Sequence, residues 1–340
     1  MHFKKSDLIV SIRLMTYNHE LFIREAMDSI MMQKTNFSFE IVVGDDFSID
    51  KTLDIIRSYS DTNTVHIKIL KREKGDIYWQ NRQKLGRLYN FTNIIENCSG
   101  KYIALLDGDD YWTDPYKLQK QVDVLEKYPE CVACHHWQRI AKRKVDGKYV
   151  EEAAPKDGHK ENTGFYEGYY PVSIASVVNI FSLKLRPKIR TLLFRNIFRE
   201  EKFPSWYHHL KFGDEPLNFI LGKHGEFYFI DEEMAVYRYT NIGMSGIFKN
   251  TKGYIEGNKE WLKIWCMILQ FYDYKYMPQA IVGMKLFLKR IFVRTENSIL
   301  YKIWMVCFIF GMNLPFPAKL KLIYFCFESH YFNNLKENKN

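Results

Sequence analysis

The stretch 101–112, KYIALLDGDDYW, is the most informative part of this chain. Its apolar first half predicts a buried strand over 101–106, and three carboxylates follow directly, at Asp107, Asp109 and Asp110. Open α/β sheets bind ligands at the carboxyl ends of their strands. Carboxylates this close repel one another, and a divalent cation such as Mg²⁺ or Mn²⁺ relieves that repulsion while also taking diphosphate oxygens. A helix cap alone would need one Asp and not three. The stretch therefore predicts a divalent-metal site on these carboxylates.

Short β-rich runs alternate with helical patterns on both sides of this stretch. We predict strands over 8–15, 39–43 and 65–70, and helices over 19–32, after Asp50, in the segment that reaches Cys98, and over 117–128. Segment 71–87 reads as a polar, basic connection, and 141–168 as a loop or hairpin. This order predicts an α/β fold with a mixed, mostly parallel sheet flanked by helices.

A second acidic segment, 42–52 (VVGDDFSIDKT), follows the predicted strand 39–43. Asp45 and Asp46 can hold a ribose or a base edge by hydrogen bonds. Acidic residues after a strand also serve as ordinary turn and helix-cap residues, so this segment taken alone leaves both interpretations open.

Composition sets limits on the compartment and the partner. The net charge of +9 suits an anionic partner, which includes nucleic acid, a phospholipid surface and a phosphorylated small molecule, or else a solvated basic surface. The six cysteines are sparse and irregular, which favours a reducing, cytoplasmic compartment over a disulfide scaffold. We expect no secretory signal, because Ser11 and Arg13 interrupt the first apolar run.

The C-terminal part has a different character. From about residue 255 the pattern is helical and rich in Trp, Phe, Met and Ile, with Lys and Arg between them. The apolar run 303–312 is shorter than the roughly 20 residues that a membrane-spanning helix needs. We therefore predict two domains, 1–250 and 251–340. The second is either a helical cap or a contact with the inner surface of the cell membrane.

Cys131, Cys134, His135 and His136 have the spacing of a c-type haem attachment and of half a zinc site. No second cysteine pair lies nearby, and the segment reads as a strand, in which residues three apart face opposite sides. Buried structural cysteines are the favoured interpretation.

These motifs together resemble glycosyltransferase family 2, the inverting enzymes with a GT-A fold. Segment 11–20 (SIRLMTYNHE) is similar to the family's first strand and nucleotide-facing turn, and 45–52 to its DD-x-S-x-D-x-T segment. Asn90 stands where the family keeps an Asn, and 100–112 is similar to the strand that ends in the D-x-D motif. The resemblance implies that a nucleotide sugar is bound by Thr16, Tyr17, Asn18, Glu20, Asp45, Asp46, Asn90, Asp107, Gly108 and Asp109.

The family's general base is an Asp at the start of a late helix, and Asp214 in FGDEPL (212–217) resembles it. Many relatives have Glu-Asp where this chain has Gly213-Asp214, so Glu215 is a competing candidate, and an N-cap role for Asp214 stays open. Arg238 resembles the family's arginine near the diphosphate, with a surface charge as the alternative. From their position relative to Asp214, we assign Ser176, Trp206, His208 and His209 to the acceptor cleft.

The resemblance implies a metal-dependent, inverting transfer from a nucleotide-diphosphate sugar. It places the metal, Mn²⁺ or Mg²⁺, on Asp107 and Asp109, and UDP is the expected nucleotide. The acceptor would be a saccharide or a lipid-linked hydroxyl, in the synthesis of a bacterial capsule, O-antigen or exopolysaccharide. The enzyme would be cytoplasmic, or peripheral on the inner face of the membrane. A phosphatase of the haloacid-dehalogenase type lacks its expected Thr or Val after the second Asp, and a catalytically silent relative is a further alternative. Charge alone suggests nucleic acid, and no supporting module accompanies it, so we expect no nucleic-acid partner.

Overall fold

The computed structural model describes residues 8–143, 149–152, 172–240, 250–295 and 299–327 of the 340-residue chain. It divides the chain into two compact units. The first comprises Met1–Ile180 with Lys184–Thr240, and the second comprises Phe181–Leu183 with Asn241–Asn340. The division at 240/241 lies earlier in the chain than the predicted boundary at 250.

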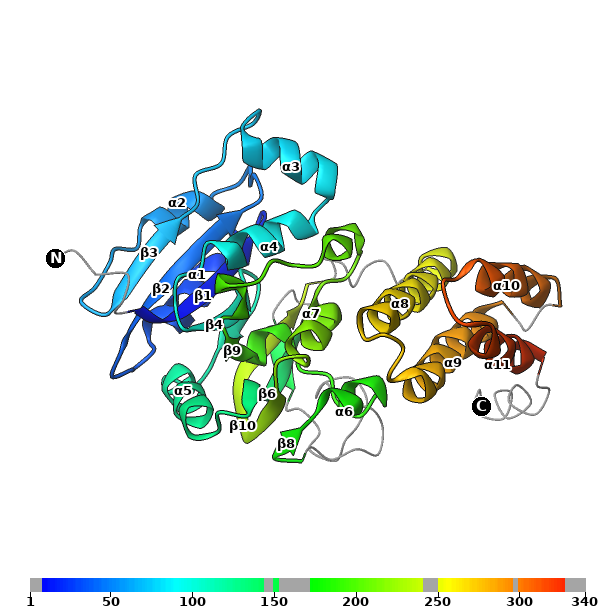
Figure 1. The fold of residues 1–340 in the computed structure, drawn as a ribbon. Coiled ribbons are helices and arrows are strands. Elements are labelled where there is room, and N and C mark those ends of the chain that lie inside the picture. The colour runs from blue at the N-terminus through cyan, green and yellow to red at the C-terminus, as the bar shows by residue number, and fades with distance from the viewer. Residues whose placement is uncertain (1–7, 144–148, 153–171, 241–249, 296–298, 328–340) are drawn as a thin grey trace. The chain divides into compact units, whose positions relative to one another are not determined.

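A mixed sheet forms the centre of the first unit. Within the described residues it has ten strands, eight of them in the order β3-β2-β1-β4-β9-β6-β10-β5, while β7 pairs with β6 and β8 with β10 (Figure 1). Strands β3, β2, β1 and β4 are parallel neighbours, as are β6 and β10, and the remaining pairs are antiparallel. The strands are β1 (Leu8–Thr16), β2 (Ser38–Asp45), β3 (Val65–Ile69), β4 (Tyr102–Asp107), β5 (Tyr111–Trp112), β6 (Cys131–Arg143), β7 (Tyr149–Glu152), β8 (Ile174–Ala175), β9 (Leu193–Arg195) and β10 (Glu226–Tyr239).

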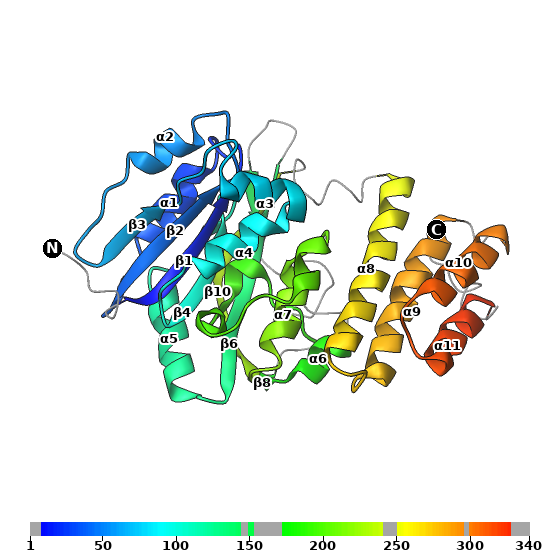
Figure 2. The ribbon, with the colours of Figure 1, turned by 45° about the horizontal axis from the view of Figure 1, so that its top comes forward.

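Helices cover both faces of the parallel strands. Helices α1 (Ile23–Met31), α2 (Thr52–Arg57) and α5 (Lys117–Lys127) bury apolar side chains in one core cluster with β1, β2 and β4. Helix α4 (Leu88–Glu96) packs against β1 and β2, and α3 (Ile77–Leu85) lies beside α4 (Figure 2). Two further helices, α6 (Val177–Phe181) and α7 (Asp214–Leu221), follow later in the chain. The α/β prediction with a mixed, mostly parallel sheet flanked by helices is confirmed.

The predicted elements are present with shifted ends, and several elements were missed, among them α3. Segment 71–87 is not only a connection, because α3 forms inside it, with the side chain of Asp76 accepting a hydrogen bond from the backbone N–H of Trp79 at 2.6 Å. This is a standard N-cap, which the basic composition of the segment obscured. Strand β7 pairs antiparallel with the end of β6, so the hairpin alternative is confirmed there, whereas 144–148 and 153–168 lie outside the described residues.

Cys131 and Cys134 are buried and free in β6, as predicted. The neighbouring His135 and His136 are buried as well, and burial lowers the pKa of both imidazoles. The segment therefore belongs to the core of the sheet.

The second unit is helical, as predicted from its pattern. It contains α8 (Thr251–Phe271), α9 (Met277–Arg294), α10 (Ile299–Gly311) and α11 (Phe316–Phe327) (Figure 1). Helices α8 and α9 pack closely, since a Cβ on Gly283 would lie 2.5 Å from the ring of Trp265. Among the described helices, none is both long and apolar enough to cross a membrane.

Candidate active site

The strand register brings the predicted site residues to one edge of the sheet. Thr16 at the end of β1 is opposite Asp45 at the end of β2, and Met15 is opposite Asp107 at the end of β4. Three parallel strands thus end at the same level, with β1 in the middle. This is the edge at which open α/β sheets bind ligands.

Asp107 is held by an arginine from the core. Arg13 on β1 is completely buried, and its Nη1 donates to a carboxylate oxygen of Asp107 at 2.6 Å. The guanidinium also lies 4.7 Å from the ring centre of Phe91. A buried charge needs such a partner, because losing its water costs several kcal/mol. Arg13 therefore orients Asp107 from beneath.

Gly108 is required by close packing. A Cβ at this position would lie 2.7 Å from Nδ1 of His19 and 2.9 Å from Oγ1 of Thr16, which themselves lie 3.2 Å apart. Any larger residue would push residues 107–110, called the acidic loop below, away from the end of β1. Burial lowers the pKa of His19, while Asp107 and Asp110 oppose that shift.

Asp110 is buried and contacts both Arg190 and the backbone of Arg238, an arrangement called the latch below. One carboxylate oxygen accepts from Nε of Arg190 at 2.6 Å, and the other accepts from the backbone N–H of Arg238 at 2.9 Å. Burial raises the pKa of Asp110 to about 7, with Arg190 opposing the shift and Asp109 adding to it. The latch joins the acidic loop to β10.

Arg238 is buried at the end of β10. Its guanidinium donates to the backbone carbonyl of Asp109 at 2.7 Å and pairs with Glu25 of α1. The central carbon of the guanidinium lies 4.9 Å from the ring centre of Phe22 and 4.9 Å from that of Tyr111. In this structure Arg238 thus braces the acidic loop, and its charge is already paired.

Asp109 differs from its neighbours. Within the described residues its carboxylate has neither an ion pair nor a side-chain hydrogen bond, although part of the residue is exposed. Crowding that removes water and, second to it, the charge of Asp107 raise its pKa to about 6, with Arg190 and Arg238 opposing the shift. These features fit a divalent cation, which would supply the ion-pair partner that this carboxylate lacks.

No group of three or more His, Cys, Asp or Glu side chains forms a metal cage in the described part of the chain. Mg²⁺ in particular is usually held by one or two carboxylates together with substrate phosphates, and Asp109 with Asp107 would be sufficient for that arrangement. The donor set therefore fits a metal that binds together with a phosphorylated substrate.

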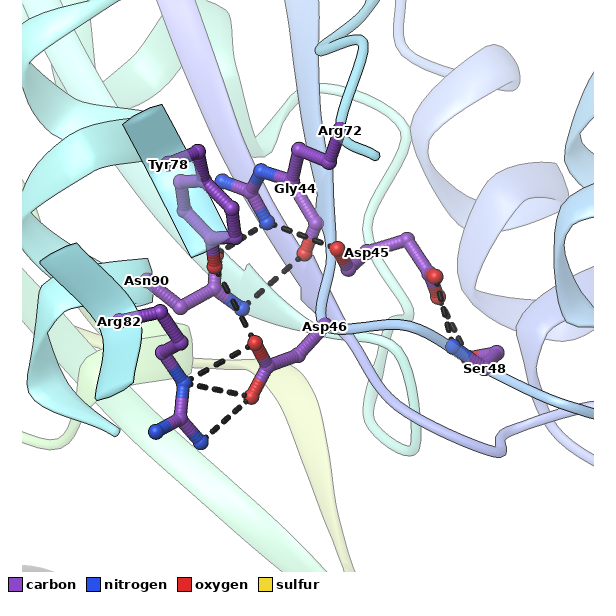
Figure 3. A network of polar contacts seen from close by, with 8 residues as sticks. All are labelled: Gly44, Asp45, Asp46, Ser48, Arg72, Tyr78, Arg82 and Asn90. Atoms are coloured by element: carbon purple, nitrogen blue, oxygen red, sulfur yellow. Dashed lines mark hydrogen bonds and ion pairs between the residues drawn. The ribbon is translucent and has the colours of Figure 1, made fainter. Parts of the chain in front are cut away.

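The end of β2 carries its own polar network (Figure 3). Asp46 accepts bonds from Nε of Arg82 at 3.0 Å and from Nη2 at 2.8 Å, and a third bond from the hydroxyl of Tyr78 at 3.1 Å. Both partners are on α3, the helix that the sequence pattern did not predict. A two-pronged arginine pair fixes the plane of a carboxylate as well as its position.

Asp45 and Asn90 belong to the same network. Asp45 accepts from the backbone N–H of Ser48 at 2.8 Å, and burial raises its pKa. Asn90 accepts from Arg72 at 2.6 Å and donates to the carbonyl of Gly44 at 3.3 Å. Figure 3 shows Arg72 and Asn90 converging on the backbone of 44–45. These contacts fix the strand end from which Asp46 projects.

The turn after β1 is tied to the acidic segment of β2. The side chain of Asn18 accepts from the N–H of Ile49 at 2.9 Å, and Glu20 accepts from the N–H of Lys51 at 3.0 Å. Asn18 has a positive φ of 51°, which Asn tolerates better than most residues. Tyr17, at the tip of the turn, is 54% exposed. The aromatic ring of Tyr17 is thus available to a ligand, whereas Asn18 and Glu20 hold the turn.

Asp214 is the first residue of α7, as predicted. Burial lowers the pKa of Arg87, and the charges of Asp214 and Asp107 oppose that shift. The guanidinium of Arg87 therefore lies within electrostatic range of both carboxylates. Glu215 instead is buried and pairs with Arg186 at 2.8 Å. The two adjacent carboxylates of α7 are thus in different environments.

The four acceptor candidates are not all together. His208 contacts Thr92 at 2.9 Å, and with Trp206 and His209 it lies in a short turn whose Tyr207 donates to the carbonyl of Gly213, just before Asp214. Ser176 precedes α6, where Val177 packs on Gly222, at the opposite end of α7 from Asp214. The structure does not bring Ser176 to the acidic cluster.

Sequence reasoning missed the arginines that hold the acidic loops. Arg13 appeared only as an interruption of an apolar run, and Arg82 and Arg190 were not considered. A charged residue inside an otherwise buried strand is a usable signal, because it must find a partner. No comparable local signal exists for Arg82 and Arg190, which are far in sequence from Asp46 and Asp110.

The family model described as Glycosyl transferase family 2 matches residues 11–185, about half of the chain. The chain belongs to glycosyltransferase family 2. This membership removes the phosphatase alternative. An uncharacterized protein of Mycobacterium tuberculosis is 30% identical over 67% of this family 2 chain and 58% of its own length. The Escherichia coli UDP-Glc:alpha-D-GlcNAc-diphosphoundecaprenol beta-1,3-glucosyltransferase WfgD is 30% identical over 42% of this chain and 51% of its own length. The chain therefore spans little more than half of these relatives.

Solved structures support the fold. S. aureus TarS superposes with a TM-score of 0.57 at 16% identity, covering 97% of this chain and 55% of TarS. Its fragment 1–349 in complex with UDP-GlcNAc gives 0.51 at 16% identity, with coverage of 96% and 92%. The expected GT-A fold with a C-terminal helical region is thus confirmed.

Proposed function

We propose that the chain is an inverting glycosyltransferase that uses a nucleotide-diphosphate sugar. The observation that carries this proposal is that Asp214 and Asp107, the neighbour of Asp109 at the end of β4, both act electrostatically on Arg87. Two carboxylates of this region, Asp109 and Asp214, have no ion pair among the described residues. One carboxylate suits a metal-bound diphosphate, and the other suits an acceptor hydroxyl. The UDP-Glc in the name of WfgD and the UDP-GlcNAc complex of TarS support UDP as the nucleotide.

The donor would lie along the ends of β2, β1 and β4. Asp46, fixed by Arg82, would accept hydrogen bonds from the base or ribose, with Thr16, Asp45 and Asn90 shaping that end of the site. Tyr17 would offer its exposed ring to the nucleoside. Asn18 and Glu20 would act indirectly, by fixing the turn that carries Tyr17.

Asp107 and Asp109 would hold Mn²⁺ or Mg²⁺. When bound, the ion supplies positive charge that stabilises the departing diphosphate. Gly108 would let the loop approach Thr16 closely enough for this arrangement. Arg238 would act as a positioning residue, because it holds the backbone of Asp109 and is already paired with Glu25.

Asp214 would accept the proton of the acceptor hydroxyl as that oxygen attacks the anomeric carbon from the side opposite the diphosphate. A sugar hydroxyl is a weak nucleophile at neutral pH, so a positioned base contributes typically 10²–10⁴-fold in rate. Direct attack inverts the anomeric centre and needs no covalent intermediate. Glu215 is poorly suited to this role, since it is buried against Arg186. Trp206, His208 and His209 would border the acceptor.

The acceptor would be a saccharide or lipid-linked hydroxyl at a membrane surface, in cell-surface polysaccharide synthesis. Helices α9, α10 and α11 contain seven Lys or Arg and no Asp or Glu. Several large side chains on α10 and α11 are exposed: Ile303, Trp304, Phe310, Phe316, Leu320, Tyr324 and Phe327. Apolar side chains among basic residues suit the interface of an anionic bilayer. The protein should sediment with phosphatidylglycerol vesicles and not with phosphatidylcholine vesicles, and equal behaviour with both would contradict this part.

The test of the proposed reaction is nucleotide release from a panel of UDP-, GDP- and dTDP-sugars with Mn²⁺ or Mg²⁺. We expect one donor to be turned over by the wild type. Asp109→Ala should lose metal-dependent donor binding. Asp214→Asn should bind the donor normally and lose at least about 100-fold in transfer to acceptor.

Glu215→Gln and the exposed Asp54→Asn on α2 are the comparison variants. Asp54→Asn should keep full activity. A donor that binds without turnover in the wild type would identify a silent relative instead. If no nucleotide sugar binds, with or without metal, the proposal is wrong.

A further inference from the structure

A short strap, defined as residues 186–190 (RPKIR), connects the two acidic elements of the site. At one end Arg186 pairs with Glu215, the neighbour of Asp214, at 2.8 Å. At the other end Arg190 pairs with Asp110, the neighbour of Asp109, at 2.6 Å. Both ends of the strap are therefore bound to residues adjacent to the carboxylates to which we assign chemistry.

The strap is also fixed through its backbone. The carbonyl of Pro187 accepts from the side chain of Asn218 on α7 at 3.0 Å. The carbonyl of Lys188 accepts from the backbone N–H of Thr191 at 2.9 Å and from its hydroxyl at 2.8 Å. Lys188 itself has extended backbone angles, with φ −94° and ψ 142°. The middle of the strap is thus a rigid position between α7 and the acidic loop.

Lys188 is the cation at that position. Unlike Arg186 and Arg190, it forms no ion pair within the described residues, and part of it remains exposed to solvent. Its surroundings are nevertheless dense, and burial lowers its pKa to about 7, with Arg186 adding to the shift and Asp214 opposing it. An ammonium in this environment gains strongly from an anionic partner.

Three other cations around the acidic loop are paired with carboxylates. Arg13 pairs with Asp107, Arg190 with Asp110 and Arg238 with Glu25. A nucleoside diphosphate brings negative charge beyond that of these carboxylates, and metal at Asp109 would neutralise only part of it. Arg87, on which Asp107 and Asp214 both act, donates to the backbone carbonyl of Lys211. On the strap, whose ends are bound to the neighbours of Asp214 and Asp109, Lys188 is the cation without an ion pair among the described residues.

We propose that Lys188 contacts the β-phosphate of the donor and stabilises it as the leaving group. This inference rests on the proposed function and adds a residue to it. The strap lies beyond residues 11–185, the part matched by the family model, so the assignment comes from the contacts of this chain. In the reaction, the bond between the anomeric carbon and the β-phosphate oxygen breaks, and the ammonium of Lys188 donates a hydrogen bond to that phosphate.

The test compares Lys188→Met and Lys188→Arg with the wild type, using calorimetric binding of the nucleoside diphosphate and of the corresponding monophosphate. Lys184→Met is the matched control, since Lys184 is exposed and lies just before the strap. Loss of one charge-assisted contact should weaken diphosphate binding by Lys188→Met about tenfold or more. Monophosphate binding should change less than about twofold, because the monophosphate has no β-phosphate. Lys188→Arg should recover most of the difference.

Equal weakening of diphosphate and monophosphate binding would show a merely structural role and overturn the inference, as would unchanged diphosphate binding. In either case the wild type would still turn over its donor, so the proposed function would stand. A wild type that binds no nucleotide at all would overturn both. If Lys188→Met does not fold, as judged by its thermal melt, Lys188→Gln provides the same comparison with a polar side chain.

Discussion

The two acidic strand ends of this protein use similar residues in opposite ways. At the end of β2, Asp45 is capped by Ser48, and Asp46 is held by Arg82 and Tyr78. At the end of β4, Asp107 is paired with the buried Arg13 and Asp110 with Arg190, whereas Asp109 has no ion pair among the described residues. The β2 end is electrostatically complete without a ligand, and the β4 end is not.

This difference suits two separate tasks, recognition of the nucleoside at the end of β2 and metal binding at the end of β4. A carboxylate with a fixed plane, such as Asp46, presents a defined hydrogen-bonding edge, which suits recognition of a base or ribose. A carboxylate whose pKa is raised by crowding, such as Asp109, gains most from a cation. Three experiments test this contrast, and they are ordered by the size of the expected effect.

Arg190→Met should have the largest effect on stability. It leaves Asp110 buried without its partner, and breaking a buried pair in this way typically costs about 3–5 kcal/mol. Chemical denaturation with wild type and variant would measure the loss. The double variant Arg190→Met/Asp110→Asn should recover part of it. A single variant as stable as the wild type would show that the latch does not hold the β4 end.

Lys117→Met should stabilise the protein by about 1 kcal/mol or more at pH 7, because a buried charge is replaced by an apolar side chain. Lys117 at the start of α5 is completely buried, hydrogen-bonds Gln121 and lies 4.1 Å from the ring centre of Trp112. Burial lowers its pKa to about 7. Like Asp109, Lys117 has no ion pair among the described residues.

The sign of the pH dependence follows from that shift. The folded state disfavours the protonated lysine, which lowers the free energy of unfolding. This loss of stability is absent above the pKa of the unfolded chain and grows as pH falls towards 7. Below the folded pKa it is constant. The advantage of Lys117→Met should therefore be larger at pH 7 than at pH 10. Thermal melts at both pH values measure it, and a constant advantage would mean that burial does not lower the pKa of Lys117 in the folded protein.

Arg82→Met should have the smallest effect on stability, about 1 kcal/mol or less, since the Arg82–Asp46 pair is partly exposed. Its main consequence should be on binding, with the nucleoside bound about fivefold more weakly because Asp46 loses its fixed plane. Calorimetry with the free nucleoside measures this loss. Arg57→Met, on the exposed face of α2, is the control. Unchanged nucleoside binding would mean that the β2 end does not recognise the nucleoside.

Local sequence signals were sufficient for the elements that carry the motifs. The apolar runs before Asp45 and Asp107 predicted β2 and β4, and the Asp-Glu-Pro segment predicted the start of α7 at Asp214. Helix α3 was missed because its apolar periodicity is weak, and only the cap at Asp76 marks it. Ser176 was placed by position along the chain, which says little about distance in space.

The sequence by itself determined the fold class, the acidic strand ends and the helix that begins at Asp214, because each depends on residues close together in the chain. Only the tertiary structure decided which carboxylates are neutralised. Arg13 lies 94 positions from Asp107, Arg190 lies 80 from Asp110, and Arg82 lies 36 from Asp46. Such pairs are chosen by which side chains the packed sheet brings together and by the cost of burying a charge alone. The same packing leaves Asp109 and Lys188 without ion pairs among the described residues.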